Sequence, residues 1–263
     1  VEFVFGKNEN GRRGAGYARN LGLERAKGKW VVFADSVDFF SKEFNQVLNL
    51  YIDNESDLIC FKYQCVDSDT LKQLPESYYM NMLKIADETH NKKLIYNIPA
   101  MYSKFVKRDL ITKYNILFQE VLFSNDNWFN LQVVFRTNTF YVANEVIYCY
   151  AIRTNSLTTK KRDFNNILIR INVLTQAILF LRKVSPENLY FWLNEYYKDI
   201  VAWNPKQQRL RLILESCNQY GYLILWLLSI HYFVPNIKHK IFHNAFTKLV
   251  KMNISNFKKN YKN

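Results

Sequence analysis

Residues 14–40 constrain this chain most, because a glycine-rich turn, a short helix, an apolar strand and two carboxylates follow one another there. The spacing of apolar residues predicts a helix over residues 17–26. Residues 30–34 are continuously apolar, which is typical of a parallel strand buried on both faces. Asp35 and Asp38 follow that strand directly. Because open α/β sheets bind ligands at the carboxyl ends of their strands, both carboxylates are candidate binding residues.

The whole ordered stretch resembles the inverting glycosyltransferases of family 2, which have the GT-A fold. Their pattern runs Gly-x-x-x-Ala-Arg-Asn-x-Gly-Leu, an Ala-x-Gly turn, an apolar strand, and Asp-Ser-Asp-Asp followed by aromatic residues. The matching positions are Gly14, Ala18, Arg19, Asn20, Gly22, Leu23, Ala26, Gly28, Asp35, Ser36 and Asp38. Val37 departs from the pattern, because it stands where the family presents a metal-binding carboxylate. An ordinary βαβ element with solvated aspartates is the alternative interpretation.

A second stretch, residues 98–135, follows the second half of the same pattern, including a strand over residues 116–120 and an acidic pair that opens a helix. The usual Glu-Asp pair is Asn125-Asp126 here. Transfer with inversion needs a base that takes the proton of the acceptor hydroxyl, and a positioned carboxylate contributes roughly 10²–10⁴-fold. The resemblance implies that Asp126 is this base. Simple capping of the helix by Asp126 is the structural alternative, and the two roles are compatible.

The resemblance also implies the other site residues. Donor binding is expected from Arg19, Asn20, Asp35 and Asp38, and the acceptor side from Glu120, Asn125 and Trp128. Asp35 and Asp38 are the expected ligands of Mg²⁺ or Mn²⁺, since hard cations prefer oxygen. Val37 offers no oxygen, so Asp38 is the nearby carboxylate that has to replace it. Neighbouring strand residues face opposite ways, so this replacement requires the chain to turn there.

The resemblance covers residues 1 to about 159 and implies a partial GT-A domain over residues 1–159, an α/β/α sandwich. The chain opens on Val1 without the strand-helix-strand unit that normally begins the family, so we expect an N-terminally incomplete domain. Helical spacing predicts a helical C-terminal region over residues 160–263. Its basic end, residues 236–263, is expected to be a solvated tail or a peripheral contact with an anionic membrane.

Several single elements are expected within the 1–159 domain. They are a strand at residues 1–5, a central strand at residues 30–34 and a Ser41-capped helix over residues 42–52. A strand from Asp57 is expected beside the central strand, followed by a variable excursion with a short hairpin and a helix over residues 67–97. Two strands are expected within residues 139–152, joined by a turn at Asn144-Glu145.

The amino-acid composition restricts the kinds of partner that the chain is expected to bind. The net charge of +13 favours acidic partners such as nucleotide diphosphates, anionic lipid or nucleic acid. No nucleic-acid-binding motif is recognised, so we expect no nucleic acid. The four cysteines form no CxxC pair, which favours reduced thiols and a cytoplasmic setting.

The leading hypothesis is a bacterial enzyme that moves a sugar, of hexosyl type, from a nucleotide-diphosphate donor to a glycan or lipid-linked acceptor. Lipopolysaccharide, capsule and exopolysaccharide are the acceptor classes considered. The alternative is a catalytically silent paralogue that keeps the fold and holds a nucleotide or glycan. Val37 and the missing N-terminal unit favour the alternative, while Asp126 opposes it.

Overall fold

The computed structural model describes residues 4, 6, 14–153 and 163–202 of the 263-residue chain. The chain forms two compact units, Val1–Leu189 and Tyr190–Asn263, and helix α7 (Leu189–Ala202) contains the described residues of the second. The strand expected before residue 6 and the basic C-terminal end lie outside the described residues. Among the described helices, none combines the length and the apolar character needed to cross a bilayer.

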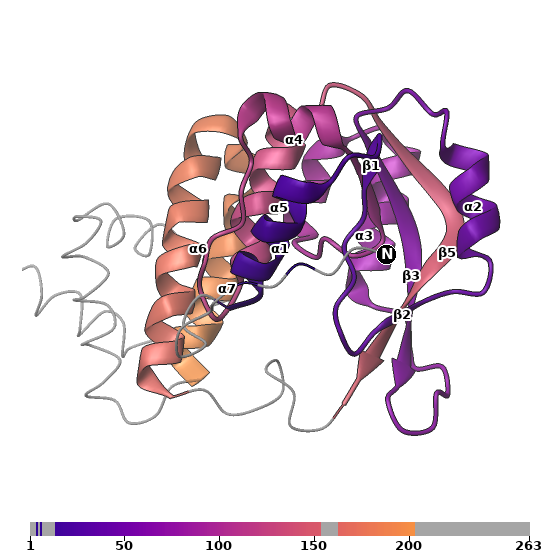
Figure 1. The fold of residues 1–263 in the computed structure, drawn as a ribbon. Helices are drawn as coiled ribbons and strands as arrows, with labels where there is room; N and C mark the ends of the chain where they lie inside the picture. The colour runs from indigo at the N-terminus through magenta and orange to yellow at the C-terminus, as the bar shows by residue number, and fades with distance from the viewer. Residues whose placement is uncertain (1–3, 5, 7–13, 154–162, 203–263) are drawn as a thin grey trace, which may run out of the picture. The chain divides into compact units, whose positions relative to one another are not determined.

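A mixed sheet organises the first unit, with strand order β1-β4-β3-β5-β2 (Figure 1). The strands are β1 (Trp30–Val31), β2 (Phe39–Phe40), β3 (Leu58–Asp67), β4 (Lys104–Lys107) and β5 (Phe140–Ile152). β3 and β5 run parallel, β4 is antiparallel to both β3 and β1, and β2 is antiparallel to β5. β1 therefore points in the same direction as β3 and β5, and the three end at the same edge.

The strand expected over residues 30–34 is shorter than predicted and differently placed. β1 contains only Trp30–Val31, and Phe33 adds one parallel bridge to Tyr102. Among the described strands β1 stands at one end of the order and β4 separates it from β3, so its predicted pairing with the Asp57 strand is wrong. Its predicted central position stays a prediction, because residues 1–3, 5 and 7–13 lie outside the described residues. Val31 and Phe33 are buried while Val32 is half-buried, so one face is covered more fully than the other. An apolar run does not specify which later strand pairs with it.

β5 is one continuous strand, whereas the sequence predicts two strands joined at Asn144-Glu145. Its register against β3 shifts on both sides of Lys62, so the extra residues of β5 form an irregularity of the bulge type within the pairing. The hydroxyl of Tyr51 donates to Glu145 Oε2 at 2.9 Å and ties helix α2 to this irregular part of β5. The polar dipeptide therefore marks a distorted strand and not a turn.

Helices cover both faces of the sheet (Figure 1). α2 (Phe44–Tyr51) lies on one side, where Phe44 packs against Phe105 and Tyr51 against Phe61. α1 (Gly14–Arg25) and α5 (Asn125–Arg136) lie on the other side. The remaining helices are α3 (Tyr78–Glu88), α4 (Arg108–Tyr114) and α6 (Phe164–Val184), with the short 3₁₀ helices η2 (Lys92–Asn97) and η3 (Pro186–Asn188).

Two expectations about helices have different outcomes. Ser41 does not cap α2, because Glu43 occupies the N-cap position and only the Ser41 carbonyl takes part, accepting from the Phe44 N–H at 3.2 Å. The excursion after β3 is confirmed as a helix, α3, whose N-cap Ser77 accepts from the Tyr79 N–H. The expected domain boundary near residue 159 lies outside the described residues and stays a prediction.

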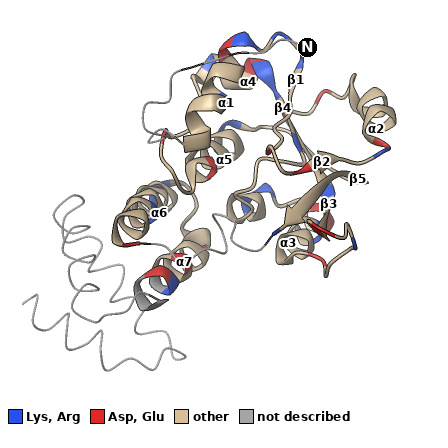
Figure 2. Cartoon of the chain, turned by 60° about the horizontal axis from the view of Figure 1, so that its bottom comes forward, with Lys and Arg blue, Asp and Glu red and all other residues tan. Residues whose placement is uncertain are grey.

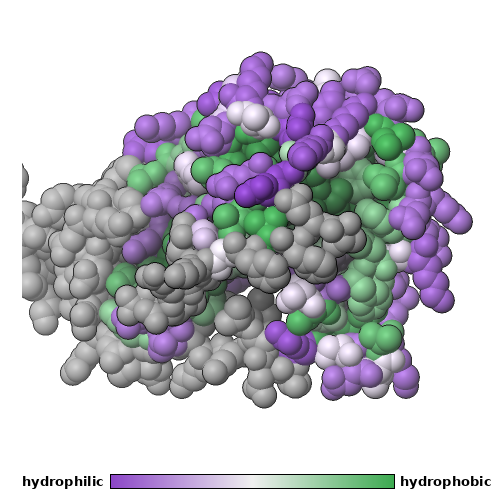
Figure 3. Space-filling model, in the orientation of Figure 1, coloured by the Kyte–Doolittle hydropathy of each residue, from purple (hydrophilic) through white to green (hydrophobic). Residues whose placement is uncertain are grey.

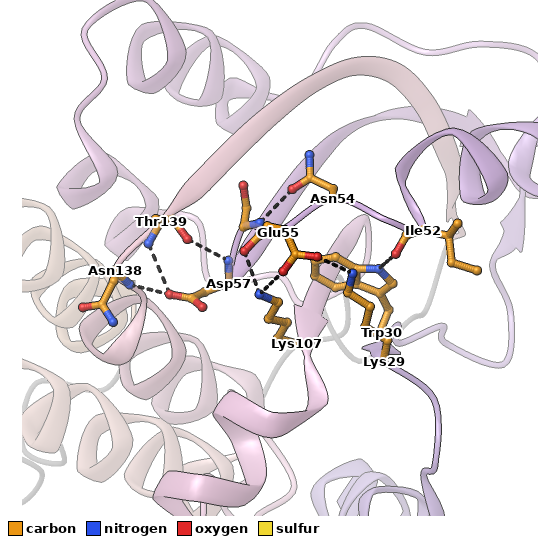
Figure 4. Close-up of polar contacts among 10 residues, drawn as sticks. Lys29, Trp30, Ile52, Asn54, Glu55, Asp57, Lys107, Asn138 and Thr139 are labelled. Atoms are coloured by element: carbon orange, nitrogen blue, oxygen red, sulfur yellow. Dashed lines mark hydrogen bonds and ion pairs between the residues drawn. The ribbon is translucent and has the colours of Figure 1, made fainter.

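A polar network holds the edge where β3 and β5 begin (Figure 4). Asp57 Oδ2 accepts from the backbone N–H groups of Asn138 at 2.8 Å and Thr139 at 3.2 Å, and the Asp57 N–H donates to the Thr139 carbonyl at 2.9 Å. Nearby, exposed Glu55 pairs with Lys29 at 3.1 Å and Lys107 at 3.3 Å. Asp57 thus fixes the start of the parallel pair, while Glu55 contributes surface ion pairs.

Asp57→Ala is expected to lower the free energy of unfolding by about 1–2 kcal/mol, because two backbone N–H groups lose a charged acceptor. Glu55→Ala is the matched control and is expected to leave the unfolding midpoint unchanged, since exposed ion pairs stabilise little. Urea unfolding followed by circular dichroism measures both variants. Equal losses for the two would contradict this assignment.

Candidate functional site

α1 approaches the segment before α5 too closely for a side chain to lie between them. A Cβ atom on Gly16 would lie 2.1 Å from the Gln119 carbonyl oxygen. A Cβ atom on Gly14, whose φ is +59°, would lie 2.2 Å from the Val121 carbonyl oxygen. These glycines lie in the first turn of α1, although the sequence predicted a turn before a helix over residues 17–26, and the close packing of the two backbones requires them.

Asn20 completes this contact from the same face of α1 as Gly16, since positions four apart lie one above the other. Its Nδ2 donates to the Phe118 carbonyl at 3.0 Å, and its Oδ1 accepts from the Phe118 N–H at 2.9 Å. The same Nδ2 lies 3.4 Å from Glu120 Oε1. The strand predicted over residues 116–120 does not form; the Asn20 side chain makes the hydrogen bonds that a neighbouring strand would make.

Arg19 joins three parts of the fold. Its Nη2 donates to Asp35 Oδ1 and its Nη1 to Asn125 Oδ1, both at 2.5 Å. Its guanidinium also lies over the Phe118 ring, 5.2 Å from the centroid. One side chain of α1 thus brings the segment after β1 together with the first residue of α5.

The chain turns between Asp35 and Asp38. Such a turn is needed if Asp38 is to take the place of the carboxylate that is missing at Val37. The Asp38 N–H donates to the Asp35 carbonyl at 3.1 Å. The Tyr148 hydroxyl accepts from the Asp35 N–H at 2.9 Å and donates to Asp38 Oδ2 at 2.7 Å, while Asp38 Oδ1 accepts from the Ala151 N–H at 2.9 Å. Burial raises the pKa of Asp38, although these hydrogen bonds act against the shift.

Asp126 lies in the first turn of α5. Ser124, with φ of 56°, occupies the N-cap position, so Asp126 is not the N-cap residue, although its carboxylate accepts from its own backbone N–H in the first turn. Burial raises the pKa of Asp126; Arg19 and Lys104 act to lower it, and Asp35 acts to raise it further. Asp126 therefore lies within electrostatic reach of the residues at the end of β1.

The structure brings most of the sequence-predicted site residues into one cluster. Its members are Arg19, Asn20, Asp35, Asp38, Glu120, Asn125 and Asp126. Trp128 is the exception, because its ring packs on Phe180 of α6 with centroids 5.4 Å apart. The roles assigned to these residues stay predictions.

Sequence reasoning missed the aromatic residues beneath the carboxylates. Tyr102 stacks on Tyr148 and Tyr150 with centroids 4.9 and 5.4 Å apart and nearly parallel rings. Burial raises the pKa of Tyr148 far above its ordinary value, so its hydroxyl stays protonated and can donate to Asp38. The available signal was the Tyr-x-Tyr spacing in β5, which places both rings on one face of the strand.

Metal binding by this cluster finds partial support. Within the residues that the structure describes, no group of three or more His, Cys, Asp or Glu side chains is arranged to hold an ion. Asp35 and Asp38 supply carboxylate oxygens at the turn, whereas Val37 is 42% exposed and supplies none. The cluster fits a hard cation only if other oxygen ligands, such as those of a diphosphate and water, complete the coordination.

The surface of the described part does not carry the positive charge of the sequence. Basic and acidic residues balance there and are interspersed (Figure 2), so the excess charge belongs to residues outside it. Hydrophobic side chains interrupt the polar surface on the face in Figure 3. Beside the candidate site, Phe39 is 40% exposed.

Comparison with solved structures identifies the fold class. The crystal structure of S. aureus TarS 1-349 in complex with UDP-GlcNAc superposes with a TM-score of 0.52 at 18% identity, over 91% of this chain and 73% of that one. The predicted GT-A fold is thereby confirmed.

Comparison of sequences finds similarity to glycosyltransferases. The Glycosyl transferase family 2 model matches residues 4–115, so this segment is similar to the members of that family. The chain is 27% identical over 177 residues to the poly(ribitol-phosphate) beta-N-acetylglucosaminyltransferase TarS of Staphylococcus aureus (strain MW2), covering 63% of this chain and 30% of TarS. It is 25% identical over 214 residues to the cholesterol galactosyltransferase of Borreliella burgdorferi (strain ATCC 35210 / DSM 4680 / CIP 102532 / B31), covering 73% and 59%.

A third relative is the uncharacterized glycosyltransferase EpsJ of Bacillus subtilis (strain 168), 26% identical over 154 residues, which are 55% of this chain and 44% of EpsJ. The chain thus spans less than two thirds of the length of each of these relatives. The family match ends before α5 and does not include Asp126.

Gly16→Ala is expected to destabilise the protein by about 1–3 kcal/mol, because the new methyl group meets a backbone oxygen. Gly22→Ala is the matched control on the same helix, where a Cβ has nothing within 4 Å. This control is expected to stabilise by about 0.5–1 kcal/mol through helix propensity. Thermal unfolding of both variants measures the difference, and a Gly16→Ala protein as stable as wild type would refute the close-packing argument.

Proposed function

We propose that the protein transfers a sugar from a nucleotide-diphosphate donor to a hydroxyl of a cell-surface glycan acceptor, with inversion at the anomeric carbon. The observation that carries this proposal is the convergence of Asp35, Arg19 and Asp126 at the carboxyl end of β1. For example, Arg19 and Asn125 are 106 positions apart in sequence, yet a hydrogen bond joins their side chains. Scattered surface charges would have no reason to meet in this way.

Asp126 acts as the general base in this proposal. It takes the proton of the acceptor hydroxyl while the hydroxyl oxygen bonds to the anomeric carbon, and the bond from that carbon to the diphosphate breaks with its electron pair leaving on the nucleotide. Burial brings the pKa of Asp126 upward, which makes it a better proton acceptor than a solvated aspartate once ionised. Asn125 and Glu120 border the base and are proposed to face the acceptor.

The donor is proposed to lie against Arg19, Asn20 and the Asp35–Asp38 turn. The guanidinium of Arg19 offers N–H donors suited to phosphate oxygens. The relatives support the substrate class, since one is named for transfer of N-acetylglucosamine to poly(ribitol-phosphate) and a fold neighbour was solved with UDP-GlcNAc.

Mg²⁺ or Mn²⁺ is the proposed cofactor, with Asp35 and Asp38 as its protein ligands. When bound, such an ion neutralises charge on the departing diphosphate. Neighbouring residues orient these two carboxylates. Tyr148 and Ala151 donate hydrogen bonds to the Asp38 carboxylate, and Arg19 donates one to the Asp35 carboxylate.

A cytoplasmic location is proposed with the same function, and a peripheral contact with anionic membrane is proposed for the basic C-terminal end, which lies outside the described residues. The cysteines that the structure describes, Cys60, Cys65 and Cys149, are free and buried, which accords with a reducing compartment. We propose no nucleic-acid partner.

A catalytically silent, donor-binding paralogue is the second candidate. Val37 favours it, because it is exposed at the turn yet offers no ligand. Asp126 and its electrostatic interaction with Arg19 favour the enzyme.

Asp126→Asn is expected to reduce sugar transfer by about 10²–10⁴-fold, because the base is lost. The same change is expected to stabilise the fold near neutral pH. The folded-state pKa of Asp126 is raised, so the folded protein holds that proton more tightly than the unfolded chain, and ionisation costs stability as pH rises through the folded pKa. The gain in melting temperature is therefore expected at neutral pH and disappears toward acid pH.

Nucleotide release from a panel of nucleotide sugars and melting curves across pH test both effects. Asp109→Asn, which changes an 89% exposed carboxylate of α4, is the control and is expected to alter neither. An Asp126→Asn protein that transfers sugar at the wild-type rate would eliminate Asp126 as the base.

Val37→Asp is expected to raise Mn²⁺ affinity and turnover, because it adds an oxygen ligand beside Asp35. Val37→Leu, which adds no oxygen, is the control. Asp38→Ala is expected to lower metal-stimulated turnover. If neither wild type nor Val37→Asp shows metal-stimulated transfer across a broad donor and acceptor panel, the silent paralogue becomes the better conclusion.

A further inference from the structure

One buried cation takes no direct part in the proposed chemistry. Lys104, at the start of β4, is 3% exposed. Its Nζ donates to the Ile98 carbonyl and to Asn130 Oδ1, both at 2.7 Å. Both acceptors are neutral, so these hydrogen bonds orient the ammonium group without cancelling its charge. An unpaired buried charge is costly, so a nearby carboxylate is expected to compensate the charge of the Lys104 ammonium group.

The geometry of α5 identifies that carboxylate. Asn130 follows Asp126 by four residues, so the two side chains lie on the same face of the helix. Asn130 is fully buried and also donates through Nδ2 to the Ile95 carbonyl at 3.2 Å, which fixes its position. An ammonium group bonded to Asn130 therefore lies below Asp126, one helical turn further along.

The environment of Asp126 contains other polar groups on each neighbouring element. Among the described residues these are Arg19 of α1, Asp35 after β1, the hydroxyl of Tyr102 before β4, and Arg170 of α6, whose Nη1 bonds Ser124 Oγ at 2.9 Å. Arg19 is already engaged by Asp35 and Asn125. Lys104 is thus a cation facing Asp126 from the sheet, with neutral hydrogen-bond partners.

We propose that Lys104 is a positioning residue for Asp126, whose buried ammonium group ties α5 to β4 and adds to the Arg19 charge a second positive charge that favours the ionised Asp126 carboxylate. This inference rests on the proposed function, because it assigns Lys104 to the proposed base. Lys104 touches neither donor nor acceptor in this proposal. It acts through the position and charge state of Asp126.

The pKa of Lys104 supports the assignment. Burial lowers this pKa to about 8, and Asp126 and Cys60 act against the decrease. The ammonium group is therefore mainly charged at neutral pH and neutral well above pH 8. Because the folded-state pKa is depressed below the unfolded value, the unfolded chain binds more protons between the two, and this group makes stability rise with pH over that interval.

The kinetic test uses full-length Lys104→Met, which removes the charge and the hydrogen bonds, and Lys104→Gln, which retains a donor for Asn130 without the charge. Nucleotide release is measured across pH with UDP-GlcNAc and with every other donor of the panel that wild type uses. Both variants are expected to show an acid limb displaced to higher pH and a kcat reduced about twofold or more at acid pH, with donor KM unchanged, because a positive charge that favours ionised Asp126 is lost. Lys107→Met, on the same strand and paired with Glu55, is the control and is expected to match wild type.

An unchanged acid limb in Lys104→Met, or complete recovery in Lys104→Gln, would overturn the proposed counter-charge. Failure of the proposed function would look different from failure of the Lys104 proposal, because wild type would then release no nucleotide from any donor in the panel.

A second measurement compares melting temperatures and therefore does not depend on enzyme activity. The loss of melting temperature caused by Lys104→Gln is compared in wild type and in Asp126→Asn. A smaller loss in the Asp126→Asn background at pH 7, with the difference vanishing near pH 9.5 where Lys104 is neutral, supports the pairing. Equal losses in both backgrounds would overturn it.

Discussion

The close contact between α1 and the segment before α5 is the constraint on which the site depends. Gly16 permits the two backbones to meet, and the Asn20 side chain satisfies both main-chain groups of Phe118. Arg19, between them in sequence, then reaches Asp35 and Asn125 at once. A larger residue at Gly16 would separate the backbones, and these hydrogen bonds require separations near 3 Å. The glycine-rich turn thus serves backbone packing before it serves any ligand.

The opposite ends of the parallel strands are stabilised by different means. Where β3 and β5 begin, Asp57 and exposed ion pairs hold the edge, with charges largely in contact with water. Where β1 and β5 end, Asp38 and Asp126 are half-buried, and burial raises their pKa values. Burial of carboxylates costs stability, and this cost is concentrated at the proposed catalytic end, as is common for functional sites.

Much of the fold class and of the candidate site could be predicted from local sequence. The α1 helix, the carboxylates after β1, and the helix that begins near Asp126 all come from contiguous residues, where helical spacing and motif order are informative. The errors concern long-range pairing: β4 was not expected between β1 and β3, and the Asn144-Glu145 pair proved to be a strand irregularity. Propensity indicates that a segment is extended, but not which neighbour it meets.

The sequence by itself determined which chemical groups are present: the arginine and asparagine of α1, the carboxylates at the turn, Val37 without a ligand atom, and Asp126. Tertiary structure decided which of these groups meet and what surrounds them. It placed Tyr148 between Asp35 and Asp38, turned Trp128 toward α6, and buried Lys104 below Asp126. These outcomes depend on desolvation and on contacts between distant segments, and neither is specified by the order of neighbouring residues.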